Sequence, residues 1–163
     1  MLPGELETAL KNASADVHYS QPAAISVSQA SEVGRVYSAA EIVALCSVAK
    51  AAGLGTHMDG ARFANAIAAT GSTPAEMTWR AGIDVLSLGA TKNGAIGAEA
   101  IVIFNPELAK GFGYRRKRGG HLFSKMRFVS AQFDAWLADS NWLNWASHAN
   151  EMAQRLGAGL TTR

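Results

Sequence analysis

Four short stretches of the chain alternate or cluster apolar residues in the way that predicts β-strands. They cover residues 23–29, 56–59, 85–88 and 100–104. Stretches between them place apolar residues three and four positions apart, which predicts helices at 5–12, 39–52, 61–70 and 75–81. The resulting order predicts an α/β fold with a mainly parallel sheet flanked by helices, because crossover helices join parallel strands.

Local signals sharpen this picture at two places. Ser38, with Glu41 three positions later, forms the pattern of a capping box at the start of the helix predicted over 39–52. The connection between the third and fourth predicted strands is too short for a crossover helix. The fourth strand is therefore predicted to run antiparallel to the third.

The last part of the chain is predicted to be helical, over 122–138 and 142–157. Three tryptophans fall close together there, at Trp136, Trp142 and Trp145. One interpretation is that these rings fill a core. The other is that they pack against a subunit or a further domain, since a monomer rarely leaves so much aromatic surface in water.

Charge and composition exclude several classes of protein. A net charge of +2 over 163 residues does not favour nucleic-acid binding, and the basic run 115–118 reads as a solvated loop. The single cysteine, Cys46, lies on an apolar helix face, which indicates an inert buried thiol. No metal is expected, because Cys and His lack the spacing of metal ligands. Without a signal peptide or membrane-spanning run, the expected location is the cytoplasm.

Lys92 stands in a turn of small residues between the third and fourth predicted strands. Its neighbours Gly89, Ala90, Gly94 and Ala95 would let a flat ligand approach the backbone closely. Apolar surroundings lower the pKa of a partly buried lysine, which then becomes the amine nucleophile that a Schiff base with pyridoxal 5'-phosphate (PLP) requires. The simpler interpretation is an ordinary lysine on a hairpin connection.

Asp59 ends the second predicted strand, and Gly60 is expected to permit a tight turn after it. Ligands of open α/β sheets bind at the carboxyl ends of strands, where Asp59 would lie. A carboxylate there can keep a pyridinium nitrogen protonated, which makes the ring an electron sink. Taken alone, an Asp-Gly pair is also a common turn or helix cap.

Together the two stretches resemble a known family. The run His-Met-Asp-Gly-Ala-Arg at 57–62 matches the H-x-DGAR motif of the PLP-dependent threonine aldolases, and Thr-Lys-Asn-Gly at 91–94 stands where they carry the PLP lysine. These enzymes belong to the aspartate-aminotransferase-like superfamily, fold type I. The resemblance implies that this chain is part of the large PLP-binding domain of such a fold.

The resemblance also implies roles for single residues. Lys92 would bind PLP and Asp59 would face its ring nitrogen, while Arg62 would lie near the PLP 3-oxygen or the substrate carboxylate. His57 would lie near the cofactor or serve the structure of the strand, and it should face the same side as Asp59. In the basic run, Arg115, Arg116 and Arg118 would contact an anion or pack between subunits.

The activity implied is aldol cleavage of threonine or related β-hydroxy-α-amino acids to glycine and an aldehyde. Alternatives are another fold type I activity, such as a β-eliminating lyase or an aminotransferase, or a non-catalytic remnant that only oligomerises. Arginine three positions after Asp59 favours the aldolase, since aminotransferases commonly have tyrosine there. The partners implied are an amino acid substrate and copies of the same chain, as a dimer or tetramer, with no nucleic acid and no membrane.

The resemblance covers the middle of the family. Residues 1–120 are expected to be a partial PLP-binding large domain, and 121–163 a helical segment that leads toward a C-terminal small domain outside this chain. No glycine-rich phosphate turn precedes Asp59. We therefore expect this piece to be inactive alone, without the phosphate cradle and the group that stacks on the ring.

Overall fold

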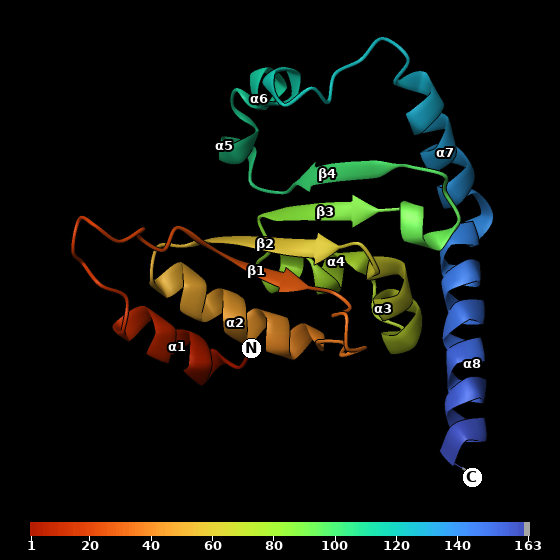
Figure 1. The fold of residues 1–163 in the computed structure, drawn as a ribbon, viewed down its shortest axis with the longest axis horizontal. Helices are drawn as coiled ribbons and strands as arrows, with labels where there is room; N and C mark the ends of the chain where they lie inside the picture. Colours follow the sequence, from red (N-terminus) through yellow and green to blue (C-terminus); the bar gives the residue numbers. More distant parts are fainter. Residues whose placement is uncertain (162–163) are drawn as a thin grey trace.

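A four-stranded sheet forms the centre of the chain in the computed structural model, which describes residues 1–161. The strands follow the sequence in space: β1 (Ala24–Ser28), β2 (Gly55–Gly60), β3 (Val85–Gly89) and β4 (Glu99–Ile103). The first three are parallel, and β4 runs antiparallel to β3, as the short connection predicts (Figure 1). The predicted α/β fold with a mainly parallel sheet is confirmed.

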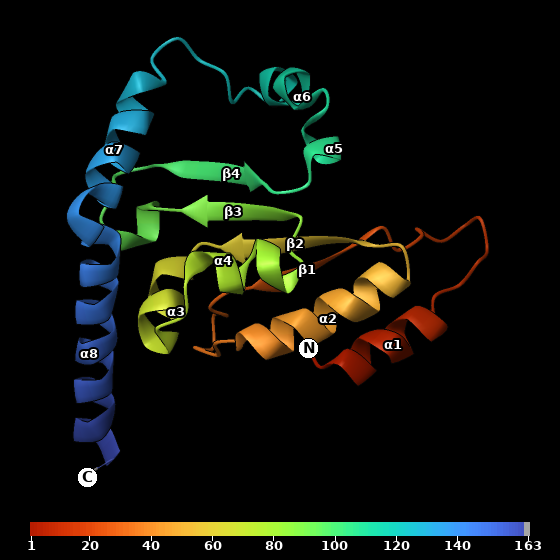
Figure 2. The ribbon, with the colours of Figure 1, turned by 180° about the vertical axis from the view of Figure 1, so that it is seen from behind.

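Helices surround this sheet on one face and along one end. In chain order they are α1 (Pro3–Lys11), α2 (Ala39–Ala51), α3 (Phe63–Thr70), α4 (Pro74–Met77), α5 (Pro106–Ala109), α6 (Phe112–Arg118), α7 (Arg127–Leu137) and α8 (Asn141–Thr161). Short 3-10 turns lie at Trp79–Ala81, Thr91–Asn93 and Ala138–Ser140. Both ribbon views show α1 and α2 on one side of the sheet, and α8 beside α3 at the end where β1, β2 and β3 finish (Figures 1 and 2).

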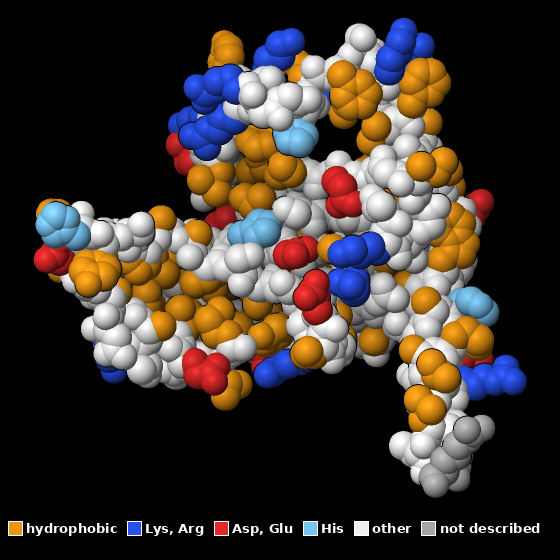
Figure 3. Space-filling view, in the orientation of Figure 1, with side chains coloured by type: hydrophobic (Ala, Val, Ile, Leu, Met, Phe, Trp, Pro, Cys, Tyr) orange, Lys and Arg blue, Asp and Glu red, His pale blue; other side chains and the backbone are white. Residues whose placement is uncertain are grey.

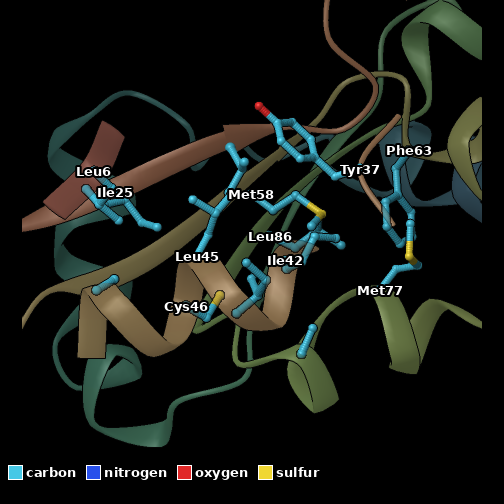
Figure 4. Packing of buried hydrophobic residues seen from close by; sticks show 14 of the residues in the cluster. Leu6, Ile25, Tyr37, Ile42, Leu45, Cys46, Met58, Phe63, Met77 and Leu86 are labelled. Carbon is cyan, nitrogen blue, oxygen red and sulfur yellow. The ribbon is translucent and has the colours of Figure 1, made fainter. Parts of the chain in front are cut away.

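The covered face holds the main core. Side chains from α2 (Ile42 and Leu45) meet Met58 of β2 and Leu86 of β3, all at most 3 % exposed (Figure 4). Cys46 on the same helix is buried, and burial raises the pKa of its thiol. The predicted inert thiol is thus a core residue, and no disulfide involves it.

The predicted start of α2 is confirmed in detail. Ser38 Oγ accepts the backbone N–H of Glu41 at 3.2 Å, and Glu41 Oε2 accepts the backbone N–H of Ser38 at 2.8 Å. This exchange satisfies two N–H groups that a helix start leaves without partners. The backbone N–H and the hydroxyl of Ser38 both donate to Glu41 Oε2, and these hydrogen bonds lower the pKa of the Glu41 carboxyl.

Gly60 has a second role beside the turn that the sequence predicts. It is the buried last residue of β2, and the turn at Ala61 and Arg62 follows it directly. A Cβ atom at this position would lie 2.8 Å from the backbone oxygen of Ser87 and 2.7 Å from Leu86 Cδ1. Glycine is needed here because β2 and β3 approach each other closely.

Two predictions for the later part of the chain are wrong in detail. The basic run 115–118 belongs to helix α6, which lies beyond β4, and is not a loop. Residues 122–126 are not helical, so the following helix begins only at Arg127. Of the two interpretations of the tryptophans, the core interpretation holds for Trp136, which is 1 % exposed, while Trp145 is 44 % exposed.

Candidate active site

The carboxyl ends of three strands bring the residues predicted from sequence to one place. Asp59 lies in β2, Arg62 follows that strand, and Lys92 follows β3. All three line one cavity of about 350 Å³, together with Ser28 at the end of β1 and residues 30–33 after it. In Figure 3, acidic and basic side chains lie next to one another over these strand ends. This is the position at which open α/β sheets bind ligands.

Two backbone contacts fix Asp59. Its Oδ1 accepts the backbone N–H of Ala61 at 3.0 Å, and its backbone oxygen accepts the N–H of Gln29 at 2.8 Å. The side chain is exposed toward the cavity. The turn uses only one carboxylate oxygen of Asp59. The other oxygen can accept a hydrogen bond from a protonated ring nitrogen.

Lys92 occupies the middle of the 3-10 turn Thr91–Asn93 and is exposed. The prediction that Lys92 is partly buried in apolar surroundings is therefore wrong, as far as residues 1–161 are concerned. Its small neighbours supply little cover, and Ile96 is 97 % exposed instead of packing over the turn. Small residues here leave the amine open to the cavity and to a ligand that enters it.

Arg62 connects this cavity to a second one. It is half-buried just before α3, and lines both the first cavity and a neighbour of about 510 Å³. The second cavity shares Glu32 and Lys92 with the first and extends toward Asn65 of α3 and Asn150 of α8. The two cavities together are lined by two carboxylates, of Asp59 and Glu32, and by two basic side chains, of Arg62 and Lys92.

His57 faces the same side of β2 as Asp59, as predicted, but among the described residues it lines neither cavity. Its Nδ1 lies 2.7 Å from Ser26 Oγ on β1 and its Nε2 lies 2.8 Å from Ser87 Oγ on β3. Both ring nitrogens are thus engaged by neighbouring strands. Within this chain the geometry favours the structural interpretation of His57.

The basic residues of α6 lie apart from these cavities. Arg115, Arg116 and Arg118 stand on a helix beyond β4, where basic side chains gather in Figure 3. Arg116 Nε donates to the backbone oxygen of His121 at 3.1 Å. Arg116 also lines a separate cavity of about 550 Å³ next to β4, with Phe112 and Phe123. Within one chain they do not meet Lys92.

Two groups of residues at the site were missed from sequence. Ser31 and Glu32 line the first cavity from the segment after β1, which the rule of strand carboxyl ends could have indicated. Asn93 and the helices α7 and α8 hold the lysine turn from behind. No local sequence pattern signals contacts between such distant positions.

Two further kinds of feature that residues 1–161 could contain are metal-binding clusters and membrane-spanning helices. No three side chains of His, Cys, Asp or Glu in this range are grouped to hold a metal ion. None of the helices described is both long and apolar enough to cross a membrane.

An open α/β sheet that gathers an aspartate, an arginine and a lysine at its carboxyl ends is typical of the fold type I class of PLP-dependent proteins. The family model described as Beta-eliminating lyase matches residues 1–162, and the chain belongs to this family.

Individual relatives agree with that assignment. The chain is 52% identical to a low specificity L-threonine aldolase of a Pseudomonas species over 93% of its own length and 43% of the relative. It is 50% identical to the corresponding Pseudomonas aeruginosa protein over 86% of this chain and 41% of that one. A solved structure of Leishmania major threonine aldolase superposes with a TM-score of 0.91 at 28% identity, covering 99% of this chain and 47% of that one. The chain thus spans less than half the length of these relatives.

Proposed function

We propose that the complete protein to which this chain belongs is a PLP-dependent lyase that cleaves threonine or a related β-hydroxy-α-amino acid into glycine and an aldehyde. The observation that carries the proposal is the single cavity that Asp59, Arg62 and Lys92 line together. Further support comes from relatives named low specificity L-threonine aldolase at 52% and 50% identity.

The donor set of this cavity fits the cofactor. Lys92 would supply a primary amine for the cofactor aldehyde, and the Asp59 carboxylate would hold a proton on the ring nitrogen. Arg62 would donate N–H groups to an anionic oxygen, either the ring 3-oxygen or the substrate carboxylate. When bound, PLP supplies a ring that takes up the electron pair released from the substrate carbon. His57 supports the strand that carries Asp59 through its two serine contacts.

We further infer how this piece fits into the whole protein. Residues 1–120 would form part of the cofactor-binding large domain, and 121–163 would lead toward a smaller C-terminal domain. In a homo-oligomer, Arg116 and Arg118 of the projecting α6 would contact an anion or the neighbouring subunit. Arg118 is exposed and Arg116 is half-buried, and neither lines the two cavities beside Lys92, which supports that inference.

The experiment that tests the function is borohydride trapping on the complete protein. The protein is loaded with PLP, reduced and digested, and the pyridoxyl adduct is mapped by mass spectrometry. We expect the adduct on Lys92, its loss in Lys92→Ala, and its retention in the control Lys50→Ala, because Lys50 lies in α2. An adduct that survives Lys92→Ala contradicts the proposal.

Product analysis separates aldol cleavage from the alternatives. Incubation with threonine should give glycine and an aldehyde in equal amounts. A β-eliminating lyase would release ammonia and a 2-keto acid instead, and an aminotransferase would require a keto acid acceptor. A complete protein that binds no PLP would support the non-catalytic interpretation.

A further inference from the structure

The lysine turn, defined here as residues 90–95, is held from behind by the C-terminal helices. Its central contact residue is Asn93, which is 9 % exposed. Asn93 Nδ2 donates to the backbone oxygen of Trp142 at 2.8 Å. In the opposite direction, Trp136 Nε1 donates to the backbone oxygen of Asn93 at 3.1 Å. One residue therefore joins the turn to both α7 and α8.

The tryptophans that take part in these contacts are themselves fixed. Trp136 is 1 % exposed, and its ring centroid lies 5.2 Å from that of Trp142 and 5.7 Å from that of Phe133. Gly94 brings the turn close to Trp145, because a Cβ at Gly94 would lie 2.8 Å from that ring. The helices thus present a rigid aromatic surface to the lysine turn.

A third contact ties the chain just after the turn. Gln132 of α7 accepts the backbone N–H groups of Ile96 at 3.0 Å and Gly97 at 3.2 Å through its Oε1. The turn also closes on itself, since the N–H groups of Asn93 and Ala95 both donate to the oxygen of Ala90, at 3.0 and 3.2 Å. These hydrogen bonds hold the backbone of the segment and do not involve the Lys92 side chain.

Lys92 itself has no such anchor. Among the described residues its amine has no hydrogen-bond or ion-pair partner, and the side chain is exposed. The direction in which the amine enters the cavity is therefore set by the backbone of the turn. Asn93 directly follows Lys92, so contacts that hold the backbone of Asn93 also hold the Cα atom from which the Lys92 side chain extends.

We propose that Asn93 is a positioning residue for Lys92, and that it acts by coupling the lysine turn to Trp136 and Trp142 of the C-terminal helices. The proposal rests on the function proposed above for Lys92. It assigns α7 and α8 a part in cofactor binding that goes beyond packing. Without the hydrogen bonds of Asn93 to the two tryptophans, the Lys92 amine should still be present, but its direction should be less well defined. The covalent link between Lys92 and the cofactor should then form less readily, because it depends on the geometry of the amine.

The test uses the complete protein and two variants. Asn93→Ala removes the donor to Trp142, and Trp136→Phe removes the donor to Asn93 while keeping an aromatic ring. Hydrogen exchange of the cofactor-free protein should become about fivefold faster at the amides of residues 93 and 95, the factor expected from one lost hydrogen bond. Equilibrium dialysis should show weaker PLP binding, and borohydride should trap a smaller fraction of adduct on Lys92.

The control separates positioning from general loss of stability. Thr56→Val breaks a network at the other end of β2, where Thr56 Oγ1 donates to the oxygen of Gly82 at 2.7 Å. It should lower the melting temperature without changing exchange at residues 93 and 95 or PLP binding. Two results would overturn the proposal. One is unchanged hydrogen exchange at residues 93 and 95 in both Asn93→Ala and Trp136→Phe, and the other is PLP binding in these two variants that is no weaker than in Thr56→Val. Failure of the wild-type protein to bind PLP overturns the proposed function instead, because the exchange result is obtained without cofactor.

Discussion

Asn65 and Asn150 hold each other in a reciprocal pair across 85 positions of sequence. Asn65 Nδ2 donates to Asn150 Oδ1 at 3.0 Å, and Asn150 Nδ2 donates to the backbone oxygen of Asn65 at 3.0 Å. The pair joins α8 to α3, and both residues line the second cavity. The position of α8 along the strand ends therefore depends on a polar contact in addition to aromatic packing.

Asn150→Ala should lower the free energy of unfolding by about 1–3 kcal/mol, because it leaves Asn65 with partly buried polar groups that have lost their partner. Urea denaturation followed by circular dichroism measures the change. Asn144→Ala on the same helix is the matched control, since Asn144 is exposed and makes only one long contact, 3.4 Å to the oxygen of Asp139. Equal effects of the two substitutions would argue against the pair.

Asp59→Asn in the complete protein should keep PLP bound on Lys92 but reduce turnover on the order of 100-fold or more, as for the loss of one electrostatic stabiliser. The amide cannot hold the ring nitrogen protonated, while it still accepts the backbone N–H of Ala61. Steady-state cleavage of threonine and borohydride trapping are measured on the same sample. Turnover near that of the wild type would reduce Asp59 to the cap of its own turn.

Gly60→Ala should destabilise the protein by about 1–3 kcal/mol, the usual cost of overpacking. The added Cβ meets the backbone oxygen of Ser87 at 2.8 Å, and backbone cannot move aside as a side chain can. Gly157→Ala serves as control, because a Cβ there has no atom within 4 Å. Thermal unfolding of both variants checks the prediction, and equal melting temperatures would contradict it.

We expect the free energy of unfolding to depend on pH through the buried thiol of Cys46. Burial raises the pKa of its thiol in the folded chain, so the unfolded chain releases the proton first as the pH rises above about 8.5. The stabilisation is fully present below that pH and is lost as the pH rises toward the folded-state pKa. Stability curves for wild type and Cys46→Ala from neutral to alkaline pH should therefore converge. A constant difference between the curves would exclude this contribution of the thiol.

Much of the fold could be predicted because its signals are local. The capping box of Ser38 with Glu41, the strand that ends near Asp59 and the antiparallel return of β4 all follow from short stretches of sequence. The meeting of Asp59 with Lys92 follows from a single rule about the carboxyl ends of strands.

The features that could not be predicted from the sequence depend on contacts between distant segments. The exposure of Lys92 and the burial of Trp136 are decided by how α7 and α8 lie against the lysine turn. The basic run was expected to be a solvated loop, yet residues 112–118 form a helix on which Arg115, Lys117 and Arg118 are exposed and Arg116 is half-buried. The domain boundary after residue 120 and the roles of Arg116 and Arg118 stay predictions.

The row formed by Ser26, His57 and Ser87 has one more consequence. A serine hydroxyl can donate or accept by rotating its hydrogen, so each of the two serines suits either a bare or a protonated ring nitrogen. A neutral imidazole meets one donor and one acceptor, and a charged imidazole meets two acceptors. The change requires only that the serine facing the bare nitrogen turns its hydrogen away, so β1, β2 and β3 can keep the same spacing beside Asp59 in either charge state.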